Sequence, residues 1–330
     1  MAEPEQESGA RARPRVTILL GPTAVGKSQI LEDMLPRLRG WRAEVINADS
    51  RQVYRGLDAG TAKPPERLRR QLPHHLIDVV DPDSQFTAGD FVRAADRLVA
   101  AIERRGGRAV VAGGAAFYLW SFLYGLPAAP PADPSVRRHL QERLRTDGVA
   151  TLHAELARND PEGAARLPAA DVNRVLRALE VFHLTGAPWS SFRPPETVRG
   201  DIELLIVGLH RERAELYERI DRRVEEMFAG GLMAEVAALR ARGWHRGTPG
   251  LRSIGYAEFF ASGSPPEAEV MRLIQRNTRR LAKRQLTFFR RFPQVRWLPA
   301  AGAAEVGAAI ERFLDPAGPV GGTRGTRTAT

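Results

Sequence analysis

Short apolar runs alternate with longer amphipathic stretches along most of the chain. The runs are continuous, as expected of strands buried on both faces of a parallel sheet, and the stretches between them have a helical period, as over residues 88–104. This alternation predicts an α/β fold with a doubly wound parallel sheet as its core. The predicted strands are residues 16–20, 45–48, 76–80, 108–112, 204–208 and 295–298.

Two proline-rich segments, "GLPAAPPADPSV" and residues 191–196, interrupt this alternation, and the pattern between them is helical. We therefore expect a first part of the core at residues 15–130, an all-helical insertion domain at 131–190, and a second part of the core with a basic C-terminal helix at 191–316. Residues 1–14 and 317–330 lack apolar periodicity and are predicted to be a disordered arm and a disordered tail.

Composition limits the class of protein. The 330 residues, 43% of them hydrophobic, can bury a substantial core. No apolar run approaches the roughly 20 residues of a membrane helix, and the first residues contain no apolar signal core, so we expect a cytoplasmic protein that does not meet the membrane. The chain has no cysteine, and its seven histidines lack the spacing of a transition-metal site, which excludes disulfides and cysteine-ligated zinc.

The formal net charge is +10, and a chain this basic usually binds a polyanion. A GC-rich genome, which favours arginine codons, would give the same balance. Only three of the 49 basic residues are lysine, namely Lys27, Lys63 and Lys283. Each lies in a segment rich in chemically distinctive residues, which indicates that arginine does not serve equally well there.

The segment "ILLGPTAVGKSQ" contains Gly21, Gly26, Lys27 and Ser28 in the order G-x-x-x-x-G-K-[ST], between a predicted strand and a predicted helix. Backbone N–H groups of such a P-loop bind phosphate oxygens, the lysine adds a charge, and the serine hydroxyl can hold Mg²⁺. A nucleoside triphosphatase usually has a further strand that ends in aspartate, but "AVVAGG" ends without one. Asp49, which ends "EVINAD", is either that magnesium ligand or a base, and the loop alone does not decide whether a nucleotide or another diphosphate binds.

Seven motifs together resemble those of the tRNA dimethylallyltransferases, in the order of that family: "GPTAVGKS", "ADSRQVYRGLDAGTAKP", "HHLIDVVDP", "GLPAAPPADPSVR", "RALEVFHLTG", "LRSIGY" and "RLAKRQLTFFRR". The resemblance implies transfer of a dimethylallyl group from dimethylallyl diphosphate to the exocyclic amine of the adenine on the 3′ side of a tRNA anticodon. It also implies that the P-loop holds the diphosphate of this donor, so that no apparatus for hydrolysis is needed. The adenine would have to leave its stack to reach the donor.

The resemblance assigns roles to particular residues. Asp49 would be the catalytic base, Lys27 would neutralise the leaving diphosphate, and Ser28 would coordinate Mg²⁺. The residues expected to bind the diphosphate are Gly21, Pro22, Thr23, Ala24, Val25, Gly26, Lys27 and Ser28. The residues expected to contact tRNA at its anticodon loop are Asp49, Ser50, Arg51, Gln52, Ala115, Arg137, Asn173, Arg174, Arg177, Arg252, Tyr256, Arg276, Arg279, Lys283, Arg284 and Gln285. We expect the protein to act as a monomer.

Basic residues recur at helical spacing through residues 270–292, opposite an apolar stripe, and no acidic residue interrupts them. Solvated faces usually mix charges of both signs, so this pattern favours contact with an RNA backbone. The basic residues are Arg272, Arg276, Arg279, Lys283 and Arg290, and the apolar stripe is Val270, Ile274, Leu281, Phe288 and Phe292.

The chain departs from the family pattern at two places. The family has Gly-Gly-Thr where this chain has Gly113, Gly114 and Ala115, so a hydroxyl expected beside the diphosphate is absent. The predicted insertion helix begins after "PAAD" instead of His-Pro-Asn-Asp. Three other functions remain open from the sequence: a P-loop kinase of a small metabolite or nucleotide, an adenylate dimethylallyltransferase, and a non-catalytic RNA-binding protein.

Overall fold

The computed structural model describes residues 13–260 and 265–314. The predicted arm, 1–14, lies outside these residues apart from its last two, and the predicted tail, 317–330, lies wholly outside them. The chain forms two compact units, of which the first comprises the described residues up to Trp120 and from Gly200 onward, and the second is Ser121–Arg199. The second unit extends beyond the insertion expected at 131–190 on both sides.

The first unit is built on a parallel sheet, which in the described residues has six strands in the order β3-β2-β4-β1-β5-β6. The strands are β1 (Arg15–Leu20), β2 (Ala43–Ala48), β3 (His74–His75), β4 (Arg108–Gly113), β5 (Glu203–His210) and β6 (Arg296–Pro299). Five of them match predicted strands within a few residues, which confirms the predicted parallel α/β core.

The strand predicted at 76–80 is wrong. The chain pairs with β2 only over His74–His75, and then Leu76 and Asp78 take positive φ angles of 61° and 57°, which end the extended backbone. The following valines pack against the loop after β2, where the N–H groups of residues 79 and 80 both donate to the carbonyl of Val53 at 2.8 and 3.0 Å. The apolar run therefore packs, partly buried, in a loop core instead of a strand.

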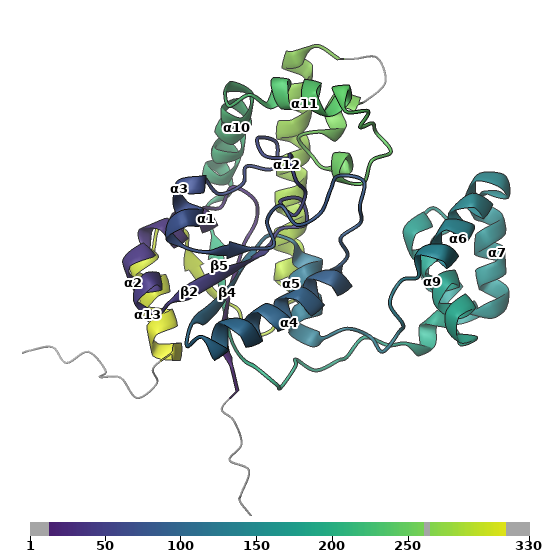
Figure 1. The fold of residues 1–330 in the computed structure, drawn as a ribbon, viewed down its shortest axis with the longest axis horizontal. Coiled ribbons are helices and arrows are strands. Elements are labelled where there is room, and N and C mark those ends of the chain that lie inside the picture. The colour runs from purple at the N-terminus through teal and green to yellow at the C-terminus, as the bar shows by residue number, and fades with distance from the viewer. Residues whose placement is uncertain (1–12, 261–264, 315–330) are drawn as a thin grey trace, which may run out of the picture. The chain divides into compact units, whose positions relative to one another are not determined.

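Helices cover both faces of the sheet (Figure 1). One face packs in a core with α1, α2 and α13, and α4 packs on the other, where Phe91 stacks on Tyr118 of α5 at 4.8 Å. None of the helices in the described residues is long and apolar enough to cross a membrane. The helices that belong to or begin in this unit are α1 (Lys27–Asp33), α2 (Leu35–Gly40), α3 (Glu66–Gln71), α4 (Ala88–Arg104), α5 (Ala116–Tyr124), α10 (Arg213–Ala229), α11 (Leu232–Ala241), α12 (Glu267–Phe289) and α13 (Ala303–Leu314), with single turns at Gly250–Arg252 and Ala257–Phe260.

The strand register brings three loops together at the carboxyl edge of the sheet. Gly113, the last residue of β4, pairs with Leu20 on one side and with Ala48 on the other. The approach is close, since a Cβ on Gly113 would lie 2.0 Å from the Ala48 carbonyl oxygen. The segments that begin at Gly21, Asp49 and Gly114 therefore start at the same level, where open α/β sheets place their ligands.

Helix α12 begins at Glu267, three residues before the predicted start, so two acidic residues lie in its first turn. Its buried stripe also differs from the predicted one. Val270 and Ile274 are buried as expected, but Gln285 and Phe289 continue the stripe, together with Ala282. The reason is that the helix passes from the core around α11 to the core on the sheet, and Leu281 and Phe288 turn instead towards a cavity.

The second unit is all-helical, as predicted, with α6 (Pro134–Thr146), α7 (Gly148–Asn159), α8 (Pro161–Arg166), α9 (Val172–Thr185) and a single turn at Trp189–Ser191. Its core is built from fully buried leucines, including Leu140, Leu152 and Leu179. Asp133 caps α6 by accepting from the N–H groups at positions 135 and 136, and Asp171 caps α9.

Candidate active site

The loop that follows β1 folds back on its own backbone. Gly26 has a φ of 116°, which glycine adopts without strain, and it leads directly into α1. The Lys27 ammonium donates hydrogen bonds to the carbonyl oxygens of Gly21 and Pro22, each at 2.9 Å. The predicted phosphate loop is therefore closed around its lysine, with Ser28 exposed at the start of the helix.

Two arginines from later in the chain hold this loop by its carbonyl groups. Arg219 of α10 donates through Nε to the Ala24 oxygen at 3.0 Å, and Arg211, which follows β5, donates through Nε to the Val25 oxygen at 2.8 Å. Neither arginine is among the predicted site residues. Both carry positive charge to the edge of the loop, where an anion would bind.

Arg223 lies one turn further along α10. Its Nη2 donates to the Thr61 carbonyl at 3.3 Å, and its Nε is buried without a hydrogen-bond partner in the described part of the chain. Burial lowers the pKa of this guanidinium, and the Asp49 carboxylate opposes that shift. Sequence reasoning missed this residue, although "ERIDRRVEE" places Arg219, Arg222 and Arg223 at helical spacing, which was the available signal.

Asp49 immediately follows β2 and lies opposite the lysine of the loop. Its Oδ1 accepts a hydrogen bond from the N–H of Arg51 at 2.8 Å, which fixes the turn. Burial lowers the pKa of Lys27 to about 8, while the Asp49 carboxylate raises that pKa and Arg223 lowers it. Asp49 therefore interacts electrostatically with both cations.

Two cavities meet at Asp49. The first, of about 320 Å³, is lined by the phosphate loop, Asn47 and the arginines of α10. The second, of about 560 Å³, is lined by Arg252 and Arg284 and by apolar side chains of α5, α10 and α12. The residues that line both cavities are Thr23, Asp49, Gly114, Arg223 and Gln285. They form a partition between a polar cavity and a wider, more apolar one.

The second cavity brings together seven of the residues predicted to contact RNA, namely Asp49, Ser50, Arg51, Ala115, Arg252, Arg284 and Gln285. Phe117, which was not predicted, also lines it, and 64% of this residue is exposed. Ala115 is held by a hydrogen bond from its N–H to the Ala48 carbonyl at 2.9 Å. Its methyl group therefore lies at the cavity, at the position where the family pattern has a hydroxyl.

Two other predicted RNA contacts are buried. Gln52 lines the first cavity and donates to the carbonyl oxygens of Thr61 and Ala62 at 3.1 and 3.2 Å. Tyr256 has no exposed surface, and its hydroxyl donates to the Glu235 carboxylate. Gln52 therefore forms part of the wall of the first cavity, whereas Tyr256 lines neither cavity and accepts a hydrogen bond from the N–H of Gly60 at 3.0 Å.

Three predicted contacts on α12 have different surroundings. Arg276 and Lys283 are exposed. Arg279 instead forms an ion pair with Asp221 of α10 at 2.8 Å and lies over the ring of Tyr217. The exposed basic face of α12 is therefore narrower than the sequence pattern indicates.

The predicted contacts in the second unit also divide into two pairs. Arg177 donates to the fully buried Glu180 at 2.9 Å, and Arg137 lies 3.7 Å from the same carboxylate. Asn173 and Arg174, at the start of α9, are exposed. The first pair neutralises a buried charge, and the second pair is accessible to a ligand.

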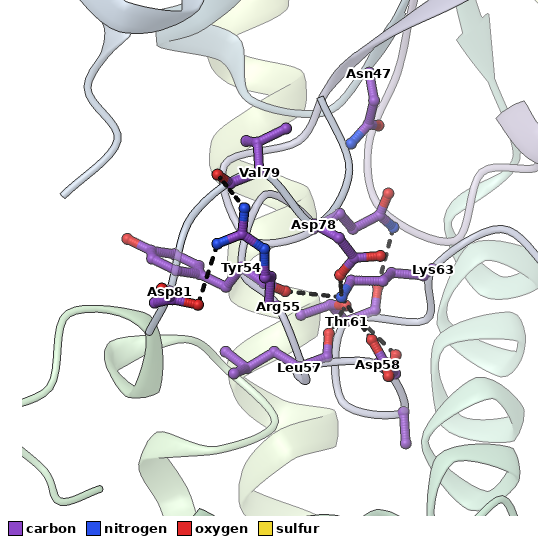
Figure 2. Close-up of polar contacts among 12 residues, drawn as sticks. Asn47, Tyr54, Arg55, Leu57, Asp58, Thr61, Lys63, Asp78, Val79 and Asp81 are labelled. Atoms are coloured by element: carbon purple, nitrogen blue, oxygen red, sulfur yellow. Dashed lines mark hydrogen bonds and ion pairs between the residues drawn. The ribbon is translucent and has the colours of Figure 1, made fainter. Parts of the chain in front are cut away.

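The segment between Asp49 and α3 is held by polar contacts around Lys63 (Figure 2). Only 5% of the Lys63 side chain is exposed. Its ammonium donates to the Tyr54 carbonyl at 2.7 Å and forms ion pairs with Asp58, at 2.5 Å, and with Asp78. This network closes the segment into a compact turn and fixes the backbone that follows Asp49.

Residues 52–292 match the family model of the IPP transferases. The chain belongs to the IPP transferase family. It is 44% identical to the tRNA dimethylallyltransferase of Geobacter metallireducens, over 88% of this chain and 94% of that protein. It is 46% identical to tRNA dimethylallyltransferase 1 of Trichlorobacter lovleyi, over 87% of this chain and 94% of that protein.

Solved structures of IPP transferases have the same fold. The tRNA isopentenylpyrophosphate transferase of Bacillus halodurans matches with a TM-score of 0.66 at 35% identity, covering 92% of this chain and 98% of that one. A eukaryotic dimethylallyltransferase acting on tRNA matches with a TM-score of 0.80, covering 94% of this chain and 82% of that one. At 24% identity this second match shows the fold alone.

Proposed function

We propose that this IPP transferase is a tRNA dimethylallyltransferase. It moves the dimethylallyl group of dimethylallyl diphosphate to the exocyclic amine of the adenine on the 3′ side of a tRNA anticodon. The observation that carries this proposal is the position of Asp49 in the partition between a polar cavity and a wider, more apolar one. A carboxylate at that point can touch both a donor and an acceptor.

The first cavity suits the diphosphate end of the donor. Loop N–H groups, Lys27 and Arg223 surround the position where negative charge grows as the carbon–oxygen bond breaks, and such preorganised charge stabilises the transition state. Lys27 and Arg223 both line this cavity, and within the described residues the Arg223 Nε has no hydrogen-bond partner. The diphosphate leaves with both electrons of that bond.

The second cavity suits the adenine. Its exocyclic nitrogen attacks the first carbon of the dimethylallyl group, a carbon–nitrogen bond forms, and the nitrogen must lose a proton. An aromatic amine becomes acidic as it is alkylated, so the Asp49 carboxylate can accept that proton. Phe117 and Tyr118 provide aromatic surface for a base that has left its stack, and Arg252 and Arg284 provide positive charge near the adjoining phosphates.

Mg²⁺ fits the first cavity by the chemistry of its lining. In the described residues no group of three or more His, Asp and Glu side chains gathers as a metal site, but Mg²⁺ commonly takes one or two protein ligands and completes its shell with phosphate oxygens and water. The Ser28 hydroxyl and the Asp49 carboxylate are the candidates in this cavity. When bound, the ion would neutralise charge on the leaving diphosphate.

The proposed partners are therefore the anticodon loop of tRNA and dimethylallyl diphosphate, and we propose that the enzyme works as a monomer in the cytoplasm. The test is incubation with radiolabelled dimethylallyl diphosphate, Mg²⁺ and an anticodon-loop RNA. We expect label in the RNA, lost when the target adenine is replaced by guanine.

Label appearing in free adenylate instead of RNA would assign the chain to adenylate prenylation. Phosphoryl transfer from ATP to a small metabolite would favour a kinase. Binding of the RNA with no transfer of label to any acceptor would leave an RNA-binding protein.

A further inference from the structure

Gln285 of α12 is buried between the two cavities. Only 8% of the residue is exposed, and it lines both cavities. Its Oε1 accepts a hydrogen bond from the N–H of Thr23 in the phosphate loop at 2.9 Å. Its Nε2 donates to the carbonyl of Gly114, directly after β4, at 2.7 Å. One amide thus bridges two of the three loops at the edge of the sheet.

The geometry requires this amide and the glycine that faces it. An amide offers one donor group and one acceptor group at the same end, whereas an ionised carboxylate offers only acceptors and a thioether almost nothing. A Cβ on Gly114 would lie 2.7 Å from the Gln285 Nε2, so a larger residue at 114 would displace the bridge. The contact therefore requires glutamine at position 285 and glycine at position 114.

Its neighbours on α12 have another role. Lys283 and Arg284, immediately before it, are exposed and available to RNA phosphates, while Gln285 is turned inward. The three residues were predicted together as RNA contacts. The structure separates them, because successive residues of a helix point about 100° apart.

We propose that Gln285 is a positioning residue of the donor site and not an RNA contact. By tying Thr23 to Gly114 it sets the phosphate loop against the end of β4, and so holds the loop N–H groups in register with Asp49. This inference rests on the proposed function for the identity of the donor. The positioning role itself depends only on the loop binding a diphosphate.

The experiment compares Gln285→Met, which keeps the length and packing of the side chain but loses both hydrogen bonds, with Lys283→Gln as a matched control on the same helix. Three quantities are measured for each: affinity for inorganic diphosphate with Mg²⁺, affinity for the anticodon-loop RNA, and the separate KM values and kcat of the transfer reaction. Thermal unfolding is followed in parallel.

For Gln285→Met we expect diphosphate affinity to fall about 10-fold or more and KM for the donor to rise with it, because two hydrogen bonds that set the loop are lost. RNA affinity should stay within about threefold of the wild type. Lys283→Gln should show the reverse, with weaker RNA binding and unchanged diphosphate binding.

Weaker RNA binding with unchanged diphosphate binding in Gln285→Met would overturn the inference and make Gln285 an RNA contact. Unchanged values for both ligands would overturn it as well. If the Met variant does not fold, Gln285→Glu decides in its place, since it keeps the acceptor for Thr23, loses the donor to Gly114 and should lose diphosphate affinity. A wild type that binds diphosphate but transfers no label would refute the proposed function and leave this inference standing.

Discussion

The Asp49 carboxylate is placed between a cationic cavity and a cavity with room for a base. Asp49→Asn preserves the shape of the side chain and can still accept the hydrogen bond from the N–H of Arg51. It cannot take up a proton, so we expect kcat to fall by roughly 10² to 10⁴ with RNA affinity within a few-fold of the wild type. Single-turnover rates and RNA binding measured on the same preparation check this. An unchanged rate would remove Asp49 from the chemistry, and a loss confined to RNA affinity would make it a recognition residue.

The pKa of Lys27 predicts how donor binding depends on pH. Burial, more than its charged neighbours, lowers its pKa to about 8, so the free enzyme loses this charge as the pH rises through that value. We expect kcat/KM for the donor to decline above about pH 8, and Lys27→Arg, which stays charged, to move that decline to higher pH. A decline at the same pH in the variant would assign it to another group.

The same pKa shift makes the folded protein more stable as the pH rises, whereas donor binding becomes weaker. Because the folded state holds this proton less tightly than the unfolded chain does, the unfolded chain binds more protons between about pH 8 and the ordinary lysine range. The destabilisation from the buried charge is fully present below about pH 8. It is relieved as the pH rises from there, where donor binding declines.

At the level of single residues, the sequence identifies those whose chemistry is tied to a local motif. Lys27 and Ser28 follow from the loop spacing, and Asp49 follows from its place at the end of a strand. Arg223 is missed, and Gln285 is predicted as an RNA contact and not as a bridge to the phosphate loop, because both reach the site from helices far along the chain. Nothing in the sequence says which face of α10 or α12 turns to the loop, since that depends on how the helices pack on the sheet.

Helix α12 is the element whose charge can be tested most directly. Arg276 and Lys283 are exposed, whereas Arg279 is paired with Asp221. Replacing Arg276 and Lys283 together by alanine should reduce the slope of log affinity for RNA against log salt concentration by about one for each lost phosphate contact. Arg279→Ala is the matched control and should lower the melting temperature while leaving that slope unchanged. If the slope of the double variant equals that of the wild type, this face of α12 does not meet RNA.

Elements were predictable where the pattern was long or strictly periodic, as in α4, which spans the predicted residues 88–104. The prediction failed over 76–80 because an apolar run of this length is buried equally well by a strand or by a loop core. The structure of this run depends on a partner elsewhere in the chain. Asp78 forms an ion pair with Lys63, and the local sequence pattern does not show that contact.

For the whole molecule, the alternation of elements predicted a parallel sheet with a helical insertion, and the structure has both. The limits of the insertion were harder to place, because proline-rich links mark a change of direction and not the residue at which packing changes. The excess of positive charge predicts a polyanionic partner, but only the folded chain shows which arginines are exposed and which form ion pairs with neighbours such as Glu180 and Asp221.

Because lysine is scarce, acylation of individual lysine amines can report which ligand is bound. Besides the α-amino group, the chain has only three amines that could react with an acylating reagent, and no thiol competes for it. Lys63 is buried in ion pairs with Asp58 and Asp78. The pKa of Lys27 is lowered to about 8, so its amine is partly deprotonated and reactive near that pH, and Lys283 is exposed. Inorganic diphosphate should therefore protect Lys27 from acylation, and anticodon-loop RNA should protect Lys283, as read by mass spectrometry of the digested protein. The binding of each ligand would then be followed through its own amine, in a single sample and without labelling either ligand.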